Sequence, residues 1–237
     1  MATDINCDMG EAMGNDELIM PYISSANIAC GYHAGDADTM RLCIESCRHY
    51  QIAIGAHPSF YDRENFGRTE MKLSPHEIYT LVRKQLEIFK QVADAAAQKI
   101  HHVKPHGALY NLSARDMVTA NVIASAVKDF DSNLILYGLS GSISISEAKK
   151  MGLQTASEVF ADRTYQDDGS LTPRSRPGAL LDNENRAVEQ VMQMVKQGMV
   201  TTVTGKAIPI LAETICIHGD GKQAVLFAKA IHKALNP

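Results

Sequence analysis

The chain has 237 residues, of which 45% are apolar and 21% are charged, and these ordinary globular values exclude a disordered protein. With 23 Lys and Arg against 27 Asp and Glu, the net charge is −4, which argues against a large surface for nucleic acid or an anionic membrane. No apolar run reaches the ~18–20 residues that a membrane span needs, and the first residues lack the basic and apolar parts of a secretory signal. We expect a cytoplasmic protein with one domain over residues 1–237.

The cysteines are odd in number and form no Cys-x-x-Cys pair. They are Cys7, Cys30, Cys43, Cys47 and Cys216. We interpret them as small buried apolar residues in a reducing compartment rather than as disulfides.

Segments of β-type residues alternate along the chain with segments of helical period. The expected strands are residues 5–9, 26–31, 52–55, 100–104, 134–137, 155–160 and 214–218. The expected helices cover 39–50, a segment opened by the capping box Ser74-Pro-His-Glu77, a segment opened by Ser113 and Asp116, a segment from Asp182 to Gly198, and 222–235.

This alternation predicts right-handed β-α-β units around a parallel sheet. Several strands are continuous apolar runs, which is typical of strands buried on both faces. About seven strands in this length favour an α/β fold of the TIM-like (β/α) barrel type with seven strands, and an open doubly wound sheet is the alternative.

Polar residues follow the expected strands at their carboxyl ends. They include Asp8, Glu11, His33, His57, Lys104, His106, Asp162, Arg163, His218 and Asp220. Since these strand ends open onto one face of a parallel α/β fold, we expect the side chains to meet at one mouth, where ligands bind. A single histidine is more often structural than a ligand, but four that converge with carboxylates indicate a site.

Two kinds of chemistry fit such a site. Imidazoles and carboxylates together bind Zn²⁺, Mn²⁺ or a similar divalent ion, which polarises a carbonyl and acidifies water. Alternatively, the same groups act without metal as general acid and base. Lys104 is either an anchoring cation or, less favoured, a Schiff-base lysine.

Two polar segments, 62–69 and 164–177, follow strand ends. They are either mobile lids that bring an arginine to an anionic ligand or plain solvated loops. The candidate arginines are Arg63, Arg68, Arg174 and Arg176. No Walker A loop, G-x-G-x-x-G turn or G-x-S-x-G elbow is present. A nucleotide would therefore be bound by no common motif of this chain, or by a partner.

Seven stretches resemble the signatures of the LamB/YcsF family, whose members form one component of the bacterial ATP-dependent 5-oxoprolinase, its A subunit. They are DINCDMGE (4–11), ANIACGYHAGD (26–36), IGAHPS (54–59), FGR (66–68), VKPHGALYN (103–111), EVFADR (158–163) and CIHGD (216–220). The resemblance implies a barrel similar to the glycoside hydrolase/deacetylase superfamily. It also implies ring opening of 5-oxo-L-proline to L-glutamate with ATP hydrolysis, in a complex with subunits B and C, while a homo-oligomer stays open.

The resemblance leads to expected roles for single residues. The expected catalytic residues are Asp8, Glu11, His33, Lys104, Asp162 and Asp220. The expected substrate-binding residues are Asn27, Arg68, Arg163 and His218. Asp8, His57 and His106 are the expected ligands if a divalent metal binds, and ATP is expected to bind with or through the partner subunits. The alternative function is a stand-alone metal-dependent amide hydrolase or deacetylase.

Overall fold

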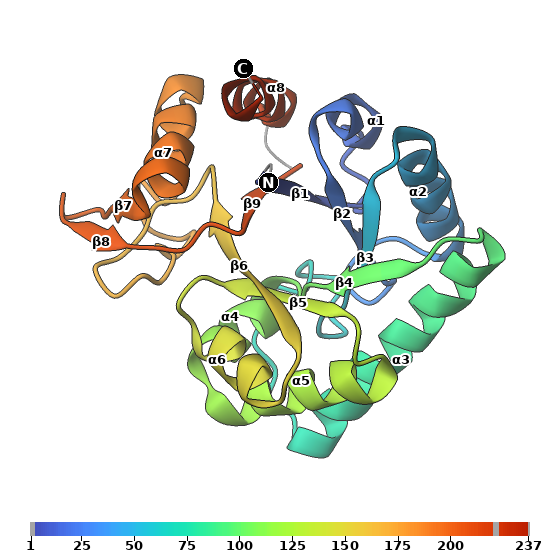
Figure 1. Ribbon diagram of the computed structural model, residues 1–237. Helices are drawn as coiled ribbons and strands as arrows, with labels where there is room; N and C mark the ends of the chain where they lie inside the picture. Colours follow the sequence, from blue (N-terminus) through green and yellow to red (C-terminus); the bar gives the residue numbers. More distant parts are fainter. Residues whose placement is uncertain (1–2, 220–222, 237) are drawn as a thin grey trace.

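Seven parallel strands close into a barrel in the computed structural model, which describes residues 3–219 and 223–236. Around the barrel the order is β1-β2-β3-β4-β5-β6-β9, and helices surround it (Figure 1). The strands are β1 (Asp4–Met9), β2 (Ser25–Ala29), β3 (Ala53–His57), β4 (Ile100–Val103), β5 (Ile135–Leu139), β6 (Gln154–Phe160) and β9 (Thr214–Ile217). The seven-stranded TIM-like barrel is thus confirmed, and the open sheet is excluded.

The helices are α1 (Asp16–Ile19), the 3₁₀ turn η1 (Met20–Tyr22), α2 (Ala37–Tyr50), α3 (Pro75–Ala95), α4 (Gly107–Arg115), α5 (Met117–Phe130), α6 (Ile143–Lys150), α7 (Glu184–Gln197) and α8 (Ala224–Leu235). Side chains cap the first backbone N–H groups of α2, α3, α5 and α7. The Ser74–Glu77 capping box opens α3 as predicted, and Asp116 caps α5.

Some elements differ from the prediction. The side chain that caps α7 belongs to Asn183 rather than Asp182, whereas Gly198 ends the helix in the left-handed conformation as expected. A two-stranded antiparallel hairpin, β7 (Met199–Thr201) and β8 (Ala207–Pro209), lies outside the barrel sheet and was not predicted. Three-residue strands give too short a periodic pattern to recognise.

The interior of the barrel is polar at the centre. Alternate residues of the strands point inward, which buries Asn6, Asn27, His102, Lys104 and Glu158. Asn27 Nδ2 donates to the side-chain oxygens of Asn6 and Asp8, each at 2.8 Å, and its own Oδ1 lies 2.8 Å from His102 Nε2. The continuous apolar runs expected for several strands therefore miss the inward polar side chains, which form a hydrogen-bonded network at the centre of the barrel.

Gly55 on β3 makes room for this network. A Cβ atom at Gly55 would lie 2.2 Å from His102 Nε2. The ring of His102 also stacks on Tyr137, with centroids 4.1 Å apart. The glycine is therefore required by the close approach of a buried ring rather than by backbone conformation.

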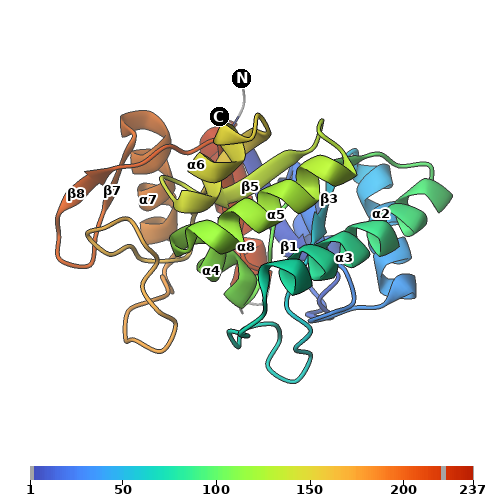
Figure 2. The ribbon, with the colours of Figure 1, turned by 90° about the horizontal axis from the view of Figure 1, so that it is seen from below.

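The long loops after β3 and β6 extend from the same side of the barrel (Figure 2). Parallel strands place all their carboxyl ends on that side, so the loops surround the mouth where ligands bind in such folds. Within the described part of the chain, no helix has the length and apolar character that crossing a membrane requires. All five cysteines are buried and free, as predicted.

Candidate active site

A pocket of about 760 Å³ opens at the carboxyl ends of the strands. Its wall includes Asp8, Glu11, His57, Lys104 and His106 from the ends of β1, β3 and β4. Arg68, Arg163, Arg174 and His218 line it from the loops and from the last strand. The predicted convergence of the strand ends on one mouth is therefore correct.

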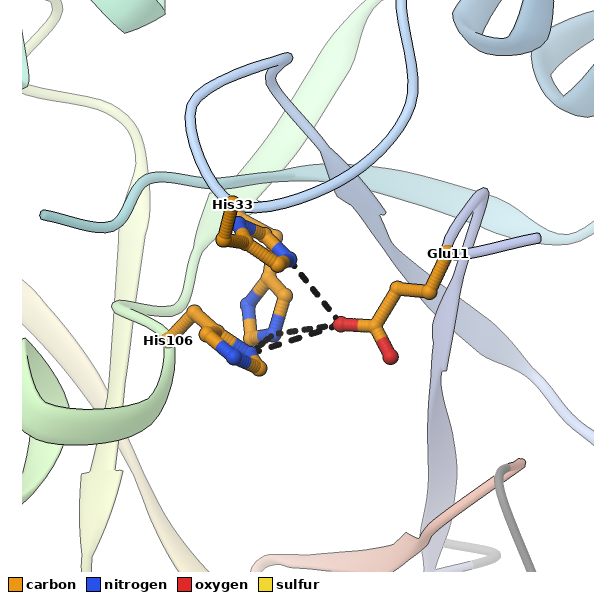
Figure 3. Close-up of side chains that lie close together, drawn as sticks. Glu11, His33 and His106 are labelled. Carbon is orange, nitrogen blue, oxygen red and sulfur yellow. Dashed lines mark hydrogen bonds and ion pairs between the residues drawn. The ribbon is translucent and has the colours of Figure 1, made fainter. Parts of the chain in front are cut away.

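Three imidazoles meet one carboxylate on the first side of the pocket. Glu11 Oε1 lies 3.0 Å from His33 Nε2 and 3.4 Å from His106 Nδ1, and Figure 3 shows the carboxylate directed at both rings. His57 Nε2 lies 2.9 Å from His106 Nδ1 and 3.3 Å from Asp8 Oδ2. We call Glu11, His33, His57 and His106 the histidine cluster.

Each ring of the histidine cluster is held from behind by a second hydrogen bond. His57 Nδ1 lies 2.7 Å from the carbonyl oxygen of Lys104, and His106 Nε2 lies 2.9 Å from that of Phe66. His33 Nδ1 lies 2.9 Å from Ser59 Oγ. Since a carbonyl oxygen only accepts, His57 Nδ1 and His106 Nε2 both carry hydrogen.

Burial disfavours the charged form of two of these rings. It lowers the pKa of His33 to about 3, with the facing His57 as the next cause, and it lowers the pKa of His106 well below the usual value. The contacts of Glu11 with these two rings are therefore contacts with neutral imidazoles at neutral pH, not ion pairs.

Lys104 lies between two carboxylates beneath the pocket. Its Nζ is 2.8 Å from Asp8 Oδ1 and 2.8 Å from Glu158 Oε1. Although burial acts against the charge, these carboxylates raise the pKa of Lys104 well above its usual value. A Schiff base needs a neutral amine, so the Schiff-base alternative does not fit this environment. Lys104 instead holds Asp8 in place.

Asp162 and His218 form a hydrogen-bonded pair on the opposite side of the pocket. His218 Nδ1 lies 2.9 Å from both carboxylate oxygens of Asp162, and its ring stacks on Phe160. Burial acts to raise the pKa of Asp162, but His218 outweighs it and the pKa is lowered. Since an ionised carboxylate only accepts, Nδ1 of His218 carries the hydrogen of this bond, and Nε2 is the nitrogen that Asp162 does not contact.

Arg163 supplies a buried positive charge beside this pair. Its side chain is buried, Nη2 donates to the carbonyl oxygen of Thr172 at 2.7 Å, and Nε has no hydrogen-bond partner among the described residues. Burial and the nearby Arg174 both lower the pKa of Arg163. Two guanidinium groups that approach each other on a pocket wall favour an anionic ligand.

The loop after β3 packs against the histidine cluster. Arg63 Nη1 donates to the carbonyl oxygens of Gly31 and Gly35, so this arginine is not available to a ligand. Gly67 packs so tightly that a Cβ atom would lie 2.9 Å from both His33 Cβ and His106 Cδ2. Its positive φ of 65° also suits glycine. Of the two arginines on this loop, Arg68 lines the pocket.

The predicted site residues lie in different surroundings. Asn27 does not line the pocket, and its amide is occupied inside the barrel, so it is not placed to bind substrate. Asp8 pairs with Lys104, whereas Glu11 and His33 complete the group of His57 and His106 that could hold a metal. His33 lies behind the pocket wall. Asp220 is outside the described residues.

Two important residues were not predicted from the sequence. Glu158 pairs with Lys104, and Ser59 supports His33. Both lie in stretches that carry the family resemblance. For Glu158, the inward alternation of charged and polar residues on β1, β4 and β6 was a usable signal.

Comparisons with known proteins agree with this architecture. The model of the LamB/YcsF family matches residues 3–237. The A subunit of 5-oxoprolinase from Shouchella clausii is 53% identical, with 97% of this chain and 93% of that protein covered. Its counterpart from Tolumonas auensis, which has the same name, is 52% identical, with 98% and 94% covered.

Solved structures give the same result. The "lactam utilization protein" of Thermus thermophilus superposes with a TM-score of 0.94 at 40% identity, covering 100% of this chain and 96% of that one. A putative cellobiose-phosphate cleavage protein of Enterococcus faecalis, 13% identical, shares the fold alone with a TM-score of 0.58 and coverage of 98% and 93%. On its sequence and its fold together, the chain belongs to the LamB/YcsF family.

Proposed function

We propose that this chain is the A subunit of an ATP-dependent 5-oxoprolinase, which opens 5-oxo-L-proline to L-glutamate. The observation that carries the proposal is the joint placement, on one pocket wall, of His218, which Asp162 holds at Nδ1, and of Arg163, whose buried Nε has no partner among the described residues. The names of the relatives from Shouchella and Tolumonas support the choice of substrate.

A lactam is a stable amide, so its carbonyl carbon needs activation before water adds. Phosphorylation of the lactam oxygen by ATP supplies that activation and releases ADP. Water then adds to the activated carbon, and the C–N bond breaks as a proton reaches the nitrogen. A second water cleaves the resulting acyl phosphate into glutamate and phosphate.

His218 is placed for the proton transfers of this sequence. In the neutral ring, Nε2 accepts a proton from the attacking water, and the imidazolium then returns it to the ring nitrogen of the substrate. Asp162 stabilises that imidazolium from the Nδ1 side, where it lies at 2.9 Å. Arg163 and Arg174 would bind the carboxylate or phosphoryl oxygens nearby.

The size of the pocket fits a ligand larger than the lactam alone. Its 760 Å³ lies within the range of about 300–1,000 Å³ that drug-sized ligands occupy. A phosphorylated lactam would use this extra room. Because the chain carries no common nucleotide motif, we assign ATP binding and phosphoryl transfer to partner subunits B and C, or to their junction with this chain. We place the assembled enzyme in the cytoplasm.

Reconstitution tests this proposal. The chain, subunits B and C, 5-oxoproline and ATP are mixed, and glutamate, ADP and phosphate are quantified. We expect glutamate and phosphate to form together only in the complete mixture. Omission of each protein in turn is the control. A complete, assembled mixture that forms no glutamate contradicts the proposal.

The second candidate is a stand-alone metal-dependent amide hydrolase, which the histidine cluster favours. It predicts that this chain alone, loaded with a divalent ion, hydrolyses small amides or acetylated sugars without ATP. The same assay without partners and ATP distinguishes the two functions.

A further inference from the structure

Backbone hydrogen bonds fix the tautomers of two facing rings in the histidine cluster. His57 Nδ1 and His106 Nε2 both donate to backbone carbonyl oxygens, so in the neutral rings the other nitrogens carry lone pairs. These are His57 Nε2 and His106 Nδ1, which lie only 2.9 Å apart. Two lone pairs at this distance repel each other unless a positive centre lies beside both.

The carboxylate of Glu11 adds negative charge beside these two nitrogens, which further favours a positive centre there. Glu11 Oε1 lies 3.4 Å from His106 Nδ1 and 3.9 Å from His57 Nε2, and it contacts His33 Nε2 at 3.0 Å. One atom from each of the four residues falls within 4.8 Å of all the others. Their side chains are at most 8% exposed, so water screens these contacts little.

The spacing of these donor atoms matches a coordination sphere. At a metal–nitrogen distance of about 2.1 Å, neighbouring donors lie about 3.0 Å apart around an octahedral ion and about 3.4 Å apart around a tetrahedral one. Three observed separations, 2.9, 3.0 and 3.4 Å, fall near these values, and the fourth, 3.9 Å between Glu11 Oε1 and His57 Nε2, is longer.

The supports behind the rings are those that metal-binding histidines use. Metal-bound imidazoles donate their second N–H to a carbonyl, a carboxylate or another acceptor, which fixes the ring and its tautomer. The carbonyl oxygens of Lys104 and Phe66 do this for His57 and His106. Ser59 Oγ accepts from His33 Nδ1 when its hydroxyl donates to the carbonyl oxygen of Phe60, at 2.9 Å.

We propose that Glu11, His33, His57 and His106 bind one divalent transition-metal ion. Three imidazoles and one carboxylate favour borderline ions such as Zn²⁺, Mn²⁺ or Co²⁺ over Mg²⁺ and Ca²⁺, which prefer oxygen ligands. Glu11, His57 and His106 line the pocket, so the ion faces the same space as His218. Asp8 lies 3.3 Å from His57 Nε2 and adds negative charge next to the site while its other oxygen bonds Lys104.

The test measures metal binding itself. The protein is treated with a chelator and then titrated with Zn²⁺, Mn²⁺ and Co²⁺ by calorimetry, with metal content checked by mass spectrometry. We expect one ion per chain and, for Co²⁺, a visible absorption band of nitrogen and oxygen ligands. Since neither substrate nor partner is present, the result is independent of the proposed function.

Variants place the ion in the cluster. His106→Ala should weaken binding at least 100-fold. Ser59→Ala retains all four ligands and should weaken binding about 10–100-fold, as loss of a supporting hydrogen bond does elsewhere. His76→Ala changes an exposed histidine on α3 and is the matched control, with unchanged affinity expected. Circular dichroism and thermal unfolding confirm that each variant is folded.

Two results overturn the proposal. One is unchanged affinity in both His106→Ala and Ser59→Ala, which would place any ion elsewhere. The other is the absence of stoichiometric binding for all three ions, with nitrogen NMR showing both nitrogens of His57 protonated. In that case an extra proton, rather than a metal ion, separates the two lone pairs.

Discussion

The two sides of the pocket are built differently. On the side of β1 to β4, charged and polar groups are buried and hold one another, as Lys104 holds Asp8. On the side of β6 and β9, His218 and Asp162 are partly exposed, and Arg163 keeps a nitrogen that no described residue pairs. The first side is a fixed scaffold that offers lone pairs, whereas the second keeps its reactive atoms available to a ligand.

This difference predicts that substitutions on the side of β6 and β9 reduce turnover, whereas substitutions on the side of β1 to β4 reduce the stability of the fold. Buried pairs that lose one member destabilise a protein, while exposed pairs contribute little. Four predictions test the distinction, in order of decreasing effect.

The largest effect is expected for His218→Gln in the assembled enzyme. It removes the proton acceptor at Nε2, so kcat should fall by about 10²- to 10⁴-fold, the range for loss of a general acid–base group. Stability in urea should fall less than in Lys104→Met below, because the Gln side-chain amide can still donate to Asp162, which pairs with His218 in the parent protein. Steady-state kinetics and a urea titration measure both. A kcat within twofold of the parent would remove His218 from the mechanism.

Lys104→Met should have the largest effect on folding. It leaves Asp8 and Glu158 without their shared cation inside the barrel, and breaking a buried pair in this way typically costs about 3–5 kcal/mol. The free energy of unfolding from urea titrations measures the loss. Lys90→Met is the control, since its pair with Asp94 on α3 is exposed and should contribute almost nothing. Equal losses in the two variants would refute the contrast between the sides.

Arg163→Lys should act mainly on binding. A charged hydrogen bond contributes about 1.5–3 kcal/mol. Lysine lacks the planar guanidinium group with its several N–H donors, so KM should rise about tenfold or more with a smaller change in kcat. Kinetics with varied 5-oxoproline and with varied ATP show which ligand the arginine binds. An unchanged KM for both would mean that Arg163 is structural, held by Thr172.

The smallest effect is expected for His102. Burial lowers the pKa of this histidine well below its usual value, and the nearby His101 and Lys104 lower it further. The folded state keeps this ring neutral, while the unfolded chain takes up a proton below about pH 6.5. Stability is therefore complete above that pH and falls as the solution becomes more acidic, by up to about 1.4 kcal/mol per pH unit for this residue.

His102→Gln should reduce that pH dependence by about one proton while keeping a donor for Asn27. Urea titrations at pH 7.5 and 5.5 measure the difference in unfolding free energy. His76→Gln, on the exposed face of α3, should leave the slope as it is. A slope that His102→Gln does not change would show that the ring is protonated in the folded protein.

Local patterns in the sequence determined most of the fold. Alternating β-type and helical segments predicted the seven barrel strands within a few residues, because burial on both faces of a parallel strand leaves a long apolar signal. The polar residues around Asp8, His57 and Lys104 predicted the mouth of the pocket, since parallel strands share their direction. The motif resemblance predicted the family that the comparisons then confirmed.

Pairing between distant residues was decided only by the tertiary structure. The sequence could not show that Lys104 faces Glu158, that Glu11 rather than Asp8 meets three imidazoles, or that Asn27 turns into the barrel. These outcomes depend on strand stagger and on which side chains point inward around a closed barrel. Lys104 and Cys216, for example, are in contact although they lie 112 positions apart, and no local pattern encodes a pairing over such a separation.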